Sequence, residues 1–153
     1  MNKSDRGRYI PLMRWKRAER VALRYLPSNV RSVVTPIVEL VPTVDNSPSK
    51  LTDEIKTNWG FSPFFLDFVN LNQIGIGNLL LTIDEAMRTY SLRPIPVTGL
   101  GRPSQYQTAL THIAADRKVG LCVRLLQTKL VNDTCVRIVR ILTEDSRLNS
   151  TAK

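Results

Sequence analysis

Strand-like segments recur at a regular spacing along this chain of 153 residues. Each segment is short, apolar and rich in β-branched or aromatic residues. The segments begin at residues 8, 33, 63, 93 and 120, so neighbouring segments start 25 to 30 residues apart. A strand–helix unit of this length is typical of parallel strands that are joined by right-handed helical crossovers. The spacing therefore predicts five βα units in an α/β fold.

The stretches between these segments show helical periodicity. Their apolar residues lie three or four positions apart, which is the spacing of one helix face. The predicted stripes are Ala18, Val21, Ala22, Tyr25 and Leu26; Leu51, Ile55 and Trp59; Leu79, Ile83, Ala86, Met87 and Tyr90; Tyr106, Ala109, Leu110 and Ile113; and Cys135, Val139 and Leu142. We expect each stripe to pack on the sheet, and Pro27 to end the first helix.

Two architectures contain five such units, namely an open flavodoxin-like sheet and part of a TIM barrel, which needs eight strands when complete. One face of the strands is apolar, whereas the other carries Glu39, Asp67 and Arg124. Charges of both signs are costly under a layer of helices but can pair inside the mouth of a barrel. We therefore predict a truncated TIM-barrel-like fold with sequential strand order 1-2-3-4-5. An order of 2-1-3-4-5 with helices on both faces would indicate the flavodoxin-like alternative.

The domain limits and the cellular compartment follow from composition. We expect one α/β domain over residues 9–146, with a disordered basic N-terminus (1–8) and a disordered C-terminal tail (147–153). The two cysteines, Cys122 and Cys135, are too few for a disulfide scaffold and are expected to be buried thiols. The N-terminus has no signal-peptide core, and no apolar run approaches the ~20 residues that span a bilayer. These features predict a cytoplasmic protein without a membrane partner.

Positive charge is concentrated at the start of the chain. The net charge is +9, and residues 1–31 hold nine Lys or Arg against two acidic residues. Such an asymmetry attracts polyanions or an acidic partner. The polyanion-binding candidates are Arg14, Arg17, Arg20 and Arg24. No recognised nucleic-acid-binding motif accompanies them, so a solvated helix face is an equally good interpretation.

Charged residues are also predicted at the C-terminal ends of the strands, where parallel α/β folds bind ligands. The ligand- or phosphate-binding candidates are Lys16, Glu39, Asp67, Arg102 and Arg124. Glu39 and Asp67 would hold Mg²⁺ while the basic side chains bind phosphate oxygens. The alternative is that these charges pair with one another and only fill the interior. No Ser/His/Asp or Cys/His arrangement is visible, so no catalytic residue is assigned.

An ordered set of motifs supports the barrel interpretation. The motifs are Tyr9 and Pro11, Lys16 with Glu19, Thr35-Pro36-Ile37-Val38-Glu39, Phe65-Leu66-Asp67, Pro96-Val97 and Val123-Arg124-Leu125. Together they resemble the N-terminal part of the Beta family proteins, which are found in tailed phages and on bacterial chromosomes. The resemblance implies a barrel-like α/β fold and no established activity. Members are typically longer than this chain, and Ala18 stands where they usually have Gly.

Three functions remain open on these grounds. The chain would be a phage or mobile-element accessory protein that acts by binding a partner, for example in phage–host conflict. Alternatively, it would be a barrel-type enzyme or half-barrel that acts on a phosphorylated substrate with Mg²⁺, or a basic nucleic-acid-binding module. An incomplete barrel leaves strand edges that a protein partner or self-association must cover. This requirement favours the first function.

Overall fold

The structure is a computed structural model that describes residues 9–42, 47–71, 75–126 and 136–141. Its elements are β1 (Leu12–Arg14), α1 (Arg17–Arg24), α2 (Ser28–Arg31), β2 (Ile37–Glu39), α3 (Pro48–Asn58), β3 (Phe64–Asp67), α4 (Ile76–Thr89), β4 (Pro94–Gly99), α5 (Ser104–Arg117), β5 (Leu121–Leu126) and β6 (Val136–Ile141). The two terminal segments that are expected to be disordered lie outside the described residues.

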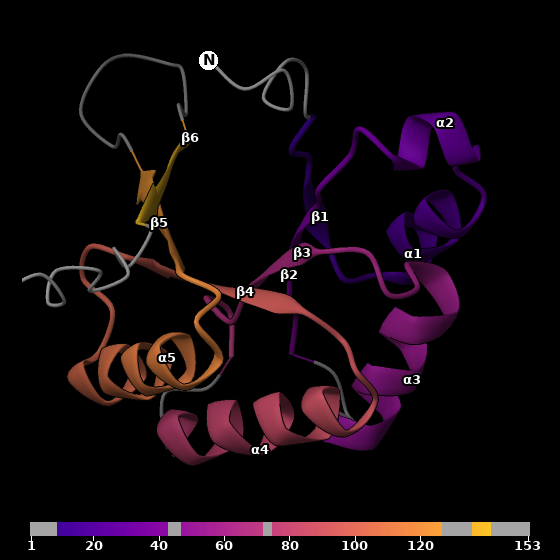
Figure 1. The fold of residues 1–153 in the computed structure, drawn as a ribbon. Coiled ribbons are helices and arrows are strands. Elements are labelled where there is room, and N and C mark those ends of the chain that lie inside the picture. The colour runs from indigo at the N-terminus through magenta and orange to yellow at the C-terminus, as the bar shows by residue number, and fades with distance from the viewer. Residues whose placement is uncertain (1–8, 43–46, 72–74, 127–135, 142–153) are drawn as a thin grey trace, which may run out of the picture.

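The strands form one open sheet in the order β1-β2-β3-β4-β5-β6. Strands β1 to β5 pair in parallel, and β6 adds to β5 in antiparallel orientation. The sequential order of the five parallel strands confirms the prediction and differs from the flavodoxin-like order. The sheet does not close into a barrel, so β1 lies at one of its ends (Figure 1).

The helices cover one face of this sheet (Figure 1). The main core joins that strand face to α1, α3, α4 and α5, and it includes Val38, Phe64 and Leu66 from the strands. A smaller cluster of Ile37, Phe65, Val97 and Cys122 occupies the opposite face and includes no helical residue. The predicted division of the strands into two faces is therefore confirmed, and Cys122 is a buried free thiol.

The predicted stripes of α3 and α5 are buried as expected, whereas the α4 stripe is buried only in part, because Leu79 and Ala86 are half-buried and Tyr90 is 41% exposed. Leu51, Ile55 and Trp59 of the α3 region are at most 8% exposed. Ile83 and Met87 of α4 are buried, as are all four stripe residues of α5. Because α3, α4 and α5 each have a helical neighbour and a strand face beneath them, the apolar stripe has a surface on which to pack.

Most of the stripe predicted for the first helix faces solvent, which corrects the sequence-based prediction, although Leu26 packs against the main core. Val21 is 43% exposed and Tyr25 is 74% exposed, whereas Leu23 is the buried residue of α1 at 2%. Arg20 forms an ion pair with Glu54, so this flank of α1 lies against α3. Helical periodicity places Ala18 and Ala22 away from that flank, and both are exposed. This part of the stripe is therefore unpacked because no described helix lies on that side of α1.

The helix predicted after the fifth strand is wrong, because residues Val136–Ile141 form β6. Four of the six residues of this segment, Val136, Ile138, Val139 and Ile141, are apolar and β-branched. β-branched residues favour a strand, and pairing with β5 satisfies the backbone groups along one edge of this segment. Residues 127–135, which include Cys135, lie outside the described residues.

Candidate functional site

Parallel register brings the charged strand residues together at one end of the sheet. Arg14 of β1 is paired with Glu39 of β2, and Glu39 is paired with Asp67 of β3. Arg124 of β5 is paired with Gly99 of β4. Side chains alternate along a strand, so these positions share the face that carries no helices. This end is the C-terminal end of the parallel strands, where α/β folds place their ligands.

The charged side chains contact one another directly. Nη1 of Arg124 lies 2.7 Å from Oε2 of Glu39 and 2.8 Å from Oδ2 of Asp67. Nη2 of Arg102, from the loop after β4, lies 2.9 Å from Oδ1 of Asp67. Nε of Arg14 lies 3.6 Å from Oε1 of Glu39. We call these five residues the strand-end cluster.

Both carboxylates have their oxygens occupied. Asn70 donates through Nδ2 to Oε1 of Glu39 at 2.8 Å, and the backbone amide of Val69 donates to Oδ1 of Asp67 at 3.0 Å. Each of the four carboxylate oxygens therefore already accepts from a donor or faces a guanidinium. Among the described residues no group of three or more His, Cys, Asp or Glu is arranged to hold a metal ion. In this arrangement the carboxylates orient the arginines.

Burial and pairing act in opposite directions on the acidic groups. Burial of Glu39 favours its neutral form, but the hydrogen bonds from Arg124 and Asn70 outweigh this effect and lower its pKa below the usual 4.5. Burial of Asp67 also favours the neutral form, and here it outweighs the opposing charges of Arg102 and Arg124. The pKa of Asp67 is therefore raised above the usual 3.8. Burial also raises the pKa of the Cys122 thiol to about 11, so that at neutral pH this cysteine is protonated and a poor nucleophile.

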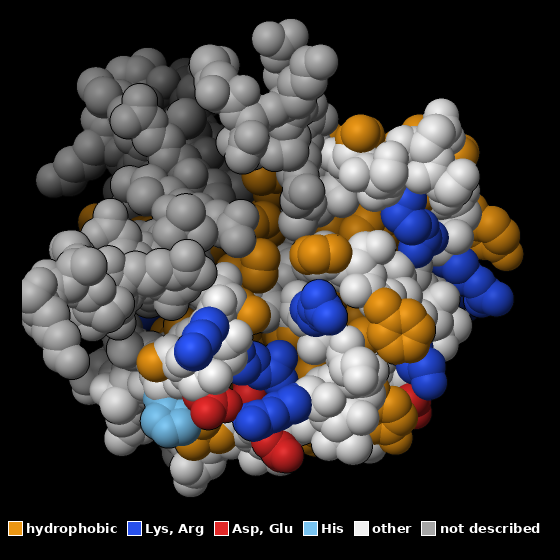
Figure 2. All heavy atoms as spheres, in the orientation of Figure 1, with side chains coloured by type: hydrophobic (Ala, Val, Ile, Leu, Met, Phe, Trp, Pro, Cys, Tyr) orange, Lys and Arg blue, Asp and Glu red, His pale blue; other side chains and the backbone are white. Residues whose placement is uncertain are grey.

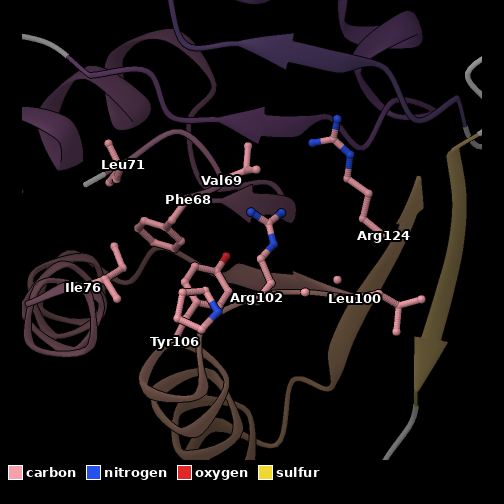
Figure 3. Close-up of a pocket in the computed structure, with 11 residues that line it drawn as sticks. Phe68, Val69, Leu71, Ile76, Leu100, Arg102, Tyr106 and Arg124 are labelled. Atoms are coloured by element: carbon pink, nitrogen blue, oxygen red, sulfur yellow. The ribbon is translucent and has the colours of Figure 1, made fainter. Parts of the chain in front are cut away.

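The cluster borders a pocket of about 470 Å³. Arg102 and Arg124 line it on one side, and Phe68, Leu71 and Ile76 contribute apolar wall. Figure 3 shows the side chains of Arg102 and Arg124 projecting in the same direction, from the loop after β4 and from β5. The pocket therefore combines two guanidinium groups with an apolar surface.

Three features near the pocket hold its shape. The hydroxyl of Tyr106 donates to the carbonyl of Val97 at 2.7 Å and anchors α5 to β4. The guanidinium of Arg102 lies 5.3 Å from the centre of the Tyr106 ring, which is within cation–π distance. A Cβ at Gly99 would lie 2.7 Å from the carbonyl oxygen of Arg124, so the close approach of β4 and β5 requires glycine there.

The structure brings together four of the five strand-end candidates, namely Glu39, Asp67, Arg102 and Arg124. Lys16 is exposed and has no ion pair with any described residue. Arg14, a polyanion-binding candidate, also belongs to the cluster, because its Nε lies 3.6 Å from Oε1 of Glu39. The sequence patterns did not single out Asn70, which follows Phe68 and Val69 in the loop after β3.

The remaining polyanion candidates do not form one surface of free arginines. Arg17 and Arg24 are exposed, whereas Arg20 is largely covered and paired with Glu54. The indole nitrogen of Trp15 also donates to Glu54, at 3.2 Å. Trp15 is buried at 5% exposure, so it is no platform for stacking bases.

A second surface lies at the β1 end of the sheet. Apolar side chains are exposed there on β1, α1 and the segments beside them: Tyr9 66%, Leu12 42%, Val21 43%, Tyr25 74%, Val30 37% and Val33 45%. Figure 2 shows apolar and basic side chains interspersed over the region of α1 and α2, at the right of the view. We call the open edge of β1 together with Ala18, Val21, Ala22 and Tyr25 of α1 the β1–α1 face. It exposes apolar surface beside a strand that has only one described partner.

The fold and the cluster define an α/β protein with a sequential parallel sheet and paired charges at its strand ends. The model of the Beta protein family matches residues 9–150, so the chain belongs to this family. No curated protein and no solved structure matches it. Within the described residues, no helix has the length and apolar character that crossing a membrane requires.

Proposed function

We propose that this protein acts by binding a partner polypeptide at the β1–α1 face, as an accessory protein of phage or mobile-element origin. The observation that carries the proposal is the exposure of the apolar stripe of α1 beside the end strand β1. A periodic apolar stripe on a helix normally packs against another element. Here Val21 and Tyr25 are exposed instead, and a partner would cover them.

The geometry indicates what kind of segment fits this face. In the rest of the sheet each parallel strand pairs with the next one, and each helix packs beside its neighbour. One further strand on β1 and one further helix beside α1 would continue this pattern. Both would bury apolar side chains and satisfy the backbone groups at the edge of the sheet. The expected partner segment is therefore a strand followed or preceded by an amphipathic helix.

The charge around the β1–α1 face indicates whether its partner is a different protein or a second copy of this chain. Arg14, Lys16, Arg17 and Arg24 are exposed around the β1–α1 face. Two copies meeting through this face would bring these cations together, and like charges across an interface oppose association. A partner that surrounds its apolar residues with Asp and Glu would be attracted instead. We therefore propose an acidic partner rather than self-association.

Photo-cross-linking tests this proposal. We would replace Tyr25 with p-benzoylphenylalanine, irradiate the host cells, and identify the cross-linked product by mass spectrometry. The same cross-linker at Leu81, which is 41% exposed on α4, is the control position. We expect one product at position 25 and not at position 81, with the cross-link in an amphipathic segment that contains Asp or Glu.

Reconstitution with the purified partner then measures the interface. Val21→Asp should weaken binding at least about tenfold, because it places a carboxylate in apolar contact and opposite acidic residues. Leu81→Asp should leave binding unchanged, and neither variant should lower the melting temperature by more than a few degrees. A cross-link only to a second copy of this chain, or only to nucleic acid, would refute the proposal, as would equal weakening by the two variants.

A further inference from the structure

Two buried arginines beside the pocket carry more hydrogen-bonding capacity than their partners use. The side chains of Arg124 and Arg102 are 10% and 13% exposed. Arg124 contacts both carboxylates through Nη1 alone, and Arg102 contacts Asp67 through Nη2 alone. Among the described residues nothing accepts from Nε or Nη2 of Arg124, or from Nε or Nη1 of Arg102. Nε of Arg124 is buried without an acceptor.

This unused capacity is unusual for groups that are so well covered. Buried polar atoms in proteins nearly always have a partner, and an unpaired N–H costs free energy. If the cluster only filled the interior, a bidentate pairing of each guanidinium with a carboxylate would use more of its donors. The observed contacts instead concentrate on one nitrogen of each arginine.

The charge of the cluster has the sign that attracts an anion. Arg14, Arg102 and Arg124 surround only two carboxylates, Glu39 and Asp67. The pairing therefore leaves one positive charge in excess at the ends of the strands. Because all the carboxylate oxygens are engaged, the side-chain groups of Arg102 and Arg124 that remain without a partner are N–H donors. Donors in a sheltered pocket bind oxyanions more strongly than the same groups in open water.

The other walls of the pocket are apolar. Phe68, Leu71 and Ile76 line it, and Leu100 lies at its rim with 86% of its surface exposed. A pocket of about 470 Å³ has the size of small-molecule sites, in which a few polar groups orient a largely apolar ligand. A ligand that uses the whole pocket therefore has an anionic end and an apolar body.

We propose that this pocket binds a small organic oxyanion, a phosphate monoester or a carboxylate that carries an apolar or aromatic body. The oxyanion accepts hydrogen bonds from Arg102 and Arg124, and a small rotation of the Arg124 guanidinium brings its buried Nε–H to the ligand. The apolar body lies against Phe68 and Ile76 (Figure 3). Glu39 and Asp67 are positioning residues, because they hold the two guanidinium groups. None of the residues that line this pocket belongs to the β1–α1 face, and the proposal does not depend on the proposed partner.

Nuclear magnetic resonance of the arginine Nε–H groups tests the proposal directly. The protein labelled with ¹⁵N is titrated separately with phenyl phosphate, benzoate and inorganic phosphate. Arg102→Lys and Arg124→Lys assign the two signals. We expect saturable shifts of these two signals with phenyl phosphate, benzoate or both, and little change at Arg17 or Arg24. The comparison of phenyl phosphate with benzoate identifies the preferred anion.

A charge at the rim supplies a variant that leaves the cluster intact. Leu100→Glu places a carboxylate at the mouth of the pocket and should weaken binding about five- to tenfold by repulsion. Leu100→Gln, which adds no charge, should weaken binding much less than Leu100→Glu. Leu81→Glu, which changes the net charge equally but lies on α4, should bind like the parent protein.

Three results would overturn the proposal. The first is the absence of saturable shifts with either organic anion in the parent protein. The second is equal weakening of ligand binding by Leu100→Glu and Leu81→Glu, which would show that only the overall charge of the protein affects binding. The third is inorganic phosphate binding as tightly as phenyl phosphate and benzoate, which would show that the apolar wall contributes nothing.

Discussion

Glu39 and Asp67 share one arginine, but burial affects them differently. The folded-state pKa of Glu39 is lowered, so its ionised form stabilises the fold above pH 4.5, and this contribution is lost as the pH falls through the folded pKa. The folded-state pKa of Asp67 is raised, so its protonated form stabilises the fold below pH 3.8. This contribution to stability is lost as the pH rises through the folded pKa. The two carboxyl groups therefore give pH dependences of opposite sign.

This difference predicts opposite behaviour of two matched variants. Glu39→Gln should cost more stability at pH 7 than at pH 3.5, whereas Asp67→Asn should cost less at pH 7 than at pH 3.5. Each unit of pKa shift corresponds to about 1.4 kcal/mol. At pH 7, Glu39→Gln should cost on the order of 3 kcal/mol, because it leaves buried positive charge without its partner. Urea unfolding of both variants and the parent across this pH range provides the measurement. Parallel pH profiles for the two variants would contradict the opposite shifts.

At the scale of elements, Arg31 joins the ends of two helices. Its Nη1 donates to the carbonyl of Trp59 at 2.6 Å, directly after α3. Its Nη2 donates to the carbonyls of Leu23 and Arg24 at 2.7 and 3.1 Å, in the last turn of α1. The guanidinium also lies 5.1 Å from the centre of the Trp59 ring. The carbonyls at a helix C-terminus have no partner within the helix, and a cation satisfies them and opposes the helix dipole.

Arg31→Met should therefore destabilise the protein by about 2 kcal/mol, because it leaves these carbonyls without a donor. Arg24→Met is the matched control, since Arg24 is an exposed arginine of the same region, and it should change stability by less than about 0.5 kcal/mol. Chemical unfolding of both variants checks the difference. Similar small effects would show that water replaces the guanidinium at both helix ends.

At the scale of the whole molecule, the open sheet has unequal ends. The β6 strand covers β5, whereas β1 has β2 as its only described neighbour. The amide of Trp15 donates to the carbonyl of Glu39, so strand alternation directs the amides of Leu12 and Arg14 away from β2. Backbone groups at such an edge are open to solvent or to an added strand.

Amide hydrogen exchange measures this inequality. The amides of Leu12 and Arg14 should exchange at least about tenfold faster than those of Phe65 and Leu66, which lie in a strand that is paired on both sides. Binding of the proposed partner should slow exchange at Leu12 and Arg14 and leave Phe65 unchanged. Strong protection of Leu12 and Arg14 in the isolated protein would mean that the β1 edge is already covered.

Local patterns were sufficient to predict the positions of β1 to β5, their parallel order and the division into two faces. The reason is that apolar alternation and the length of each unit depend only on nearby residues. The same alternation predicted that Glu39, Asp67 and Arg124 share a face. Alternation does not indicate β6, because Val136–Ile141 has no period of two, and only its β-branched residues favour a strand.

Only the tertiary structure decided which side of α1 is buried and how the charges pair. The apolar stripe of α1 is real, but a stripe is buried only where another element lies beside it, and α3 lies beside Arg20 instead. Likewise, Arg14 and Asn70 reach Glu39 because strand register and the loop after β3 bring them there. Such contacts depend on the positions of distant segments, which no local pattern contains. The alternating residues determined this protein's sheet, whereas the packing of segments determined its pocket and its exposed face.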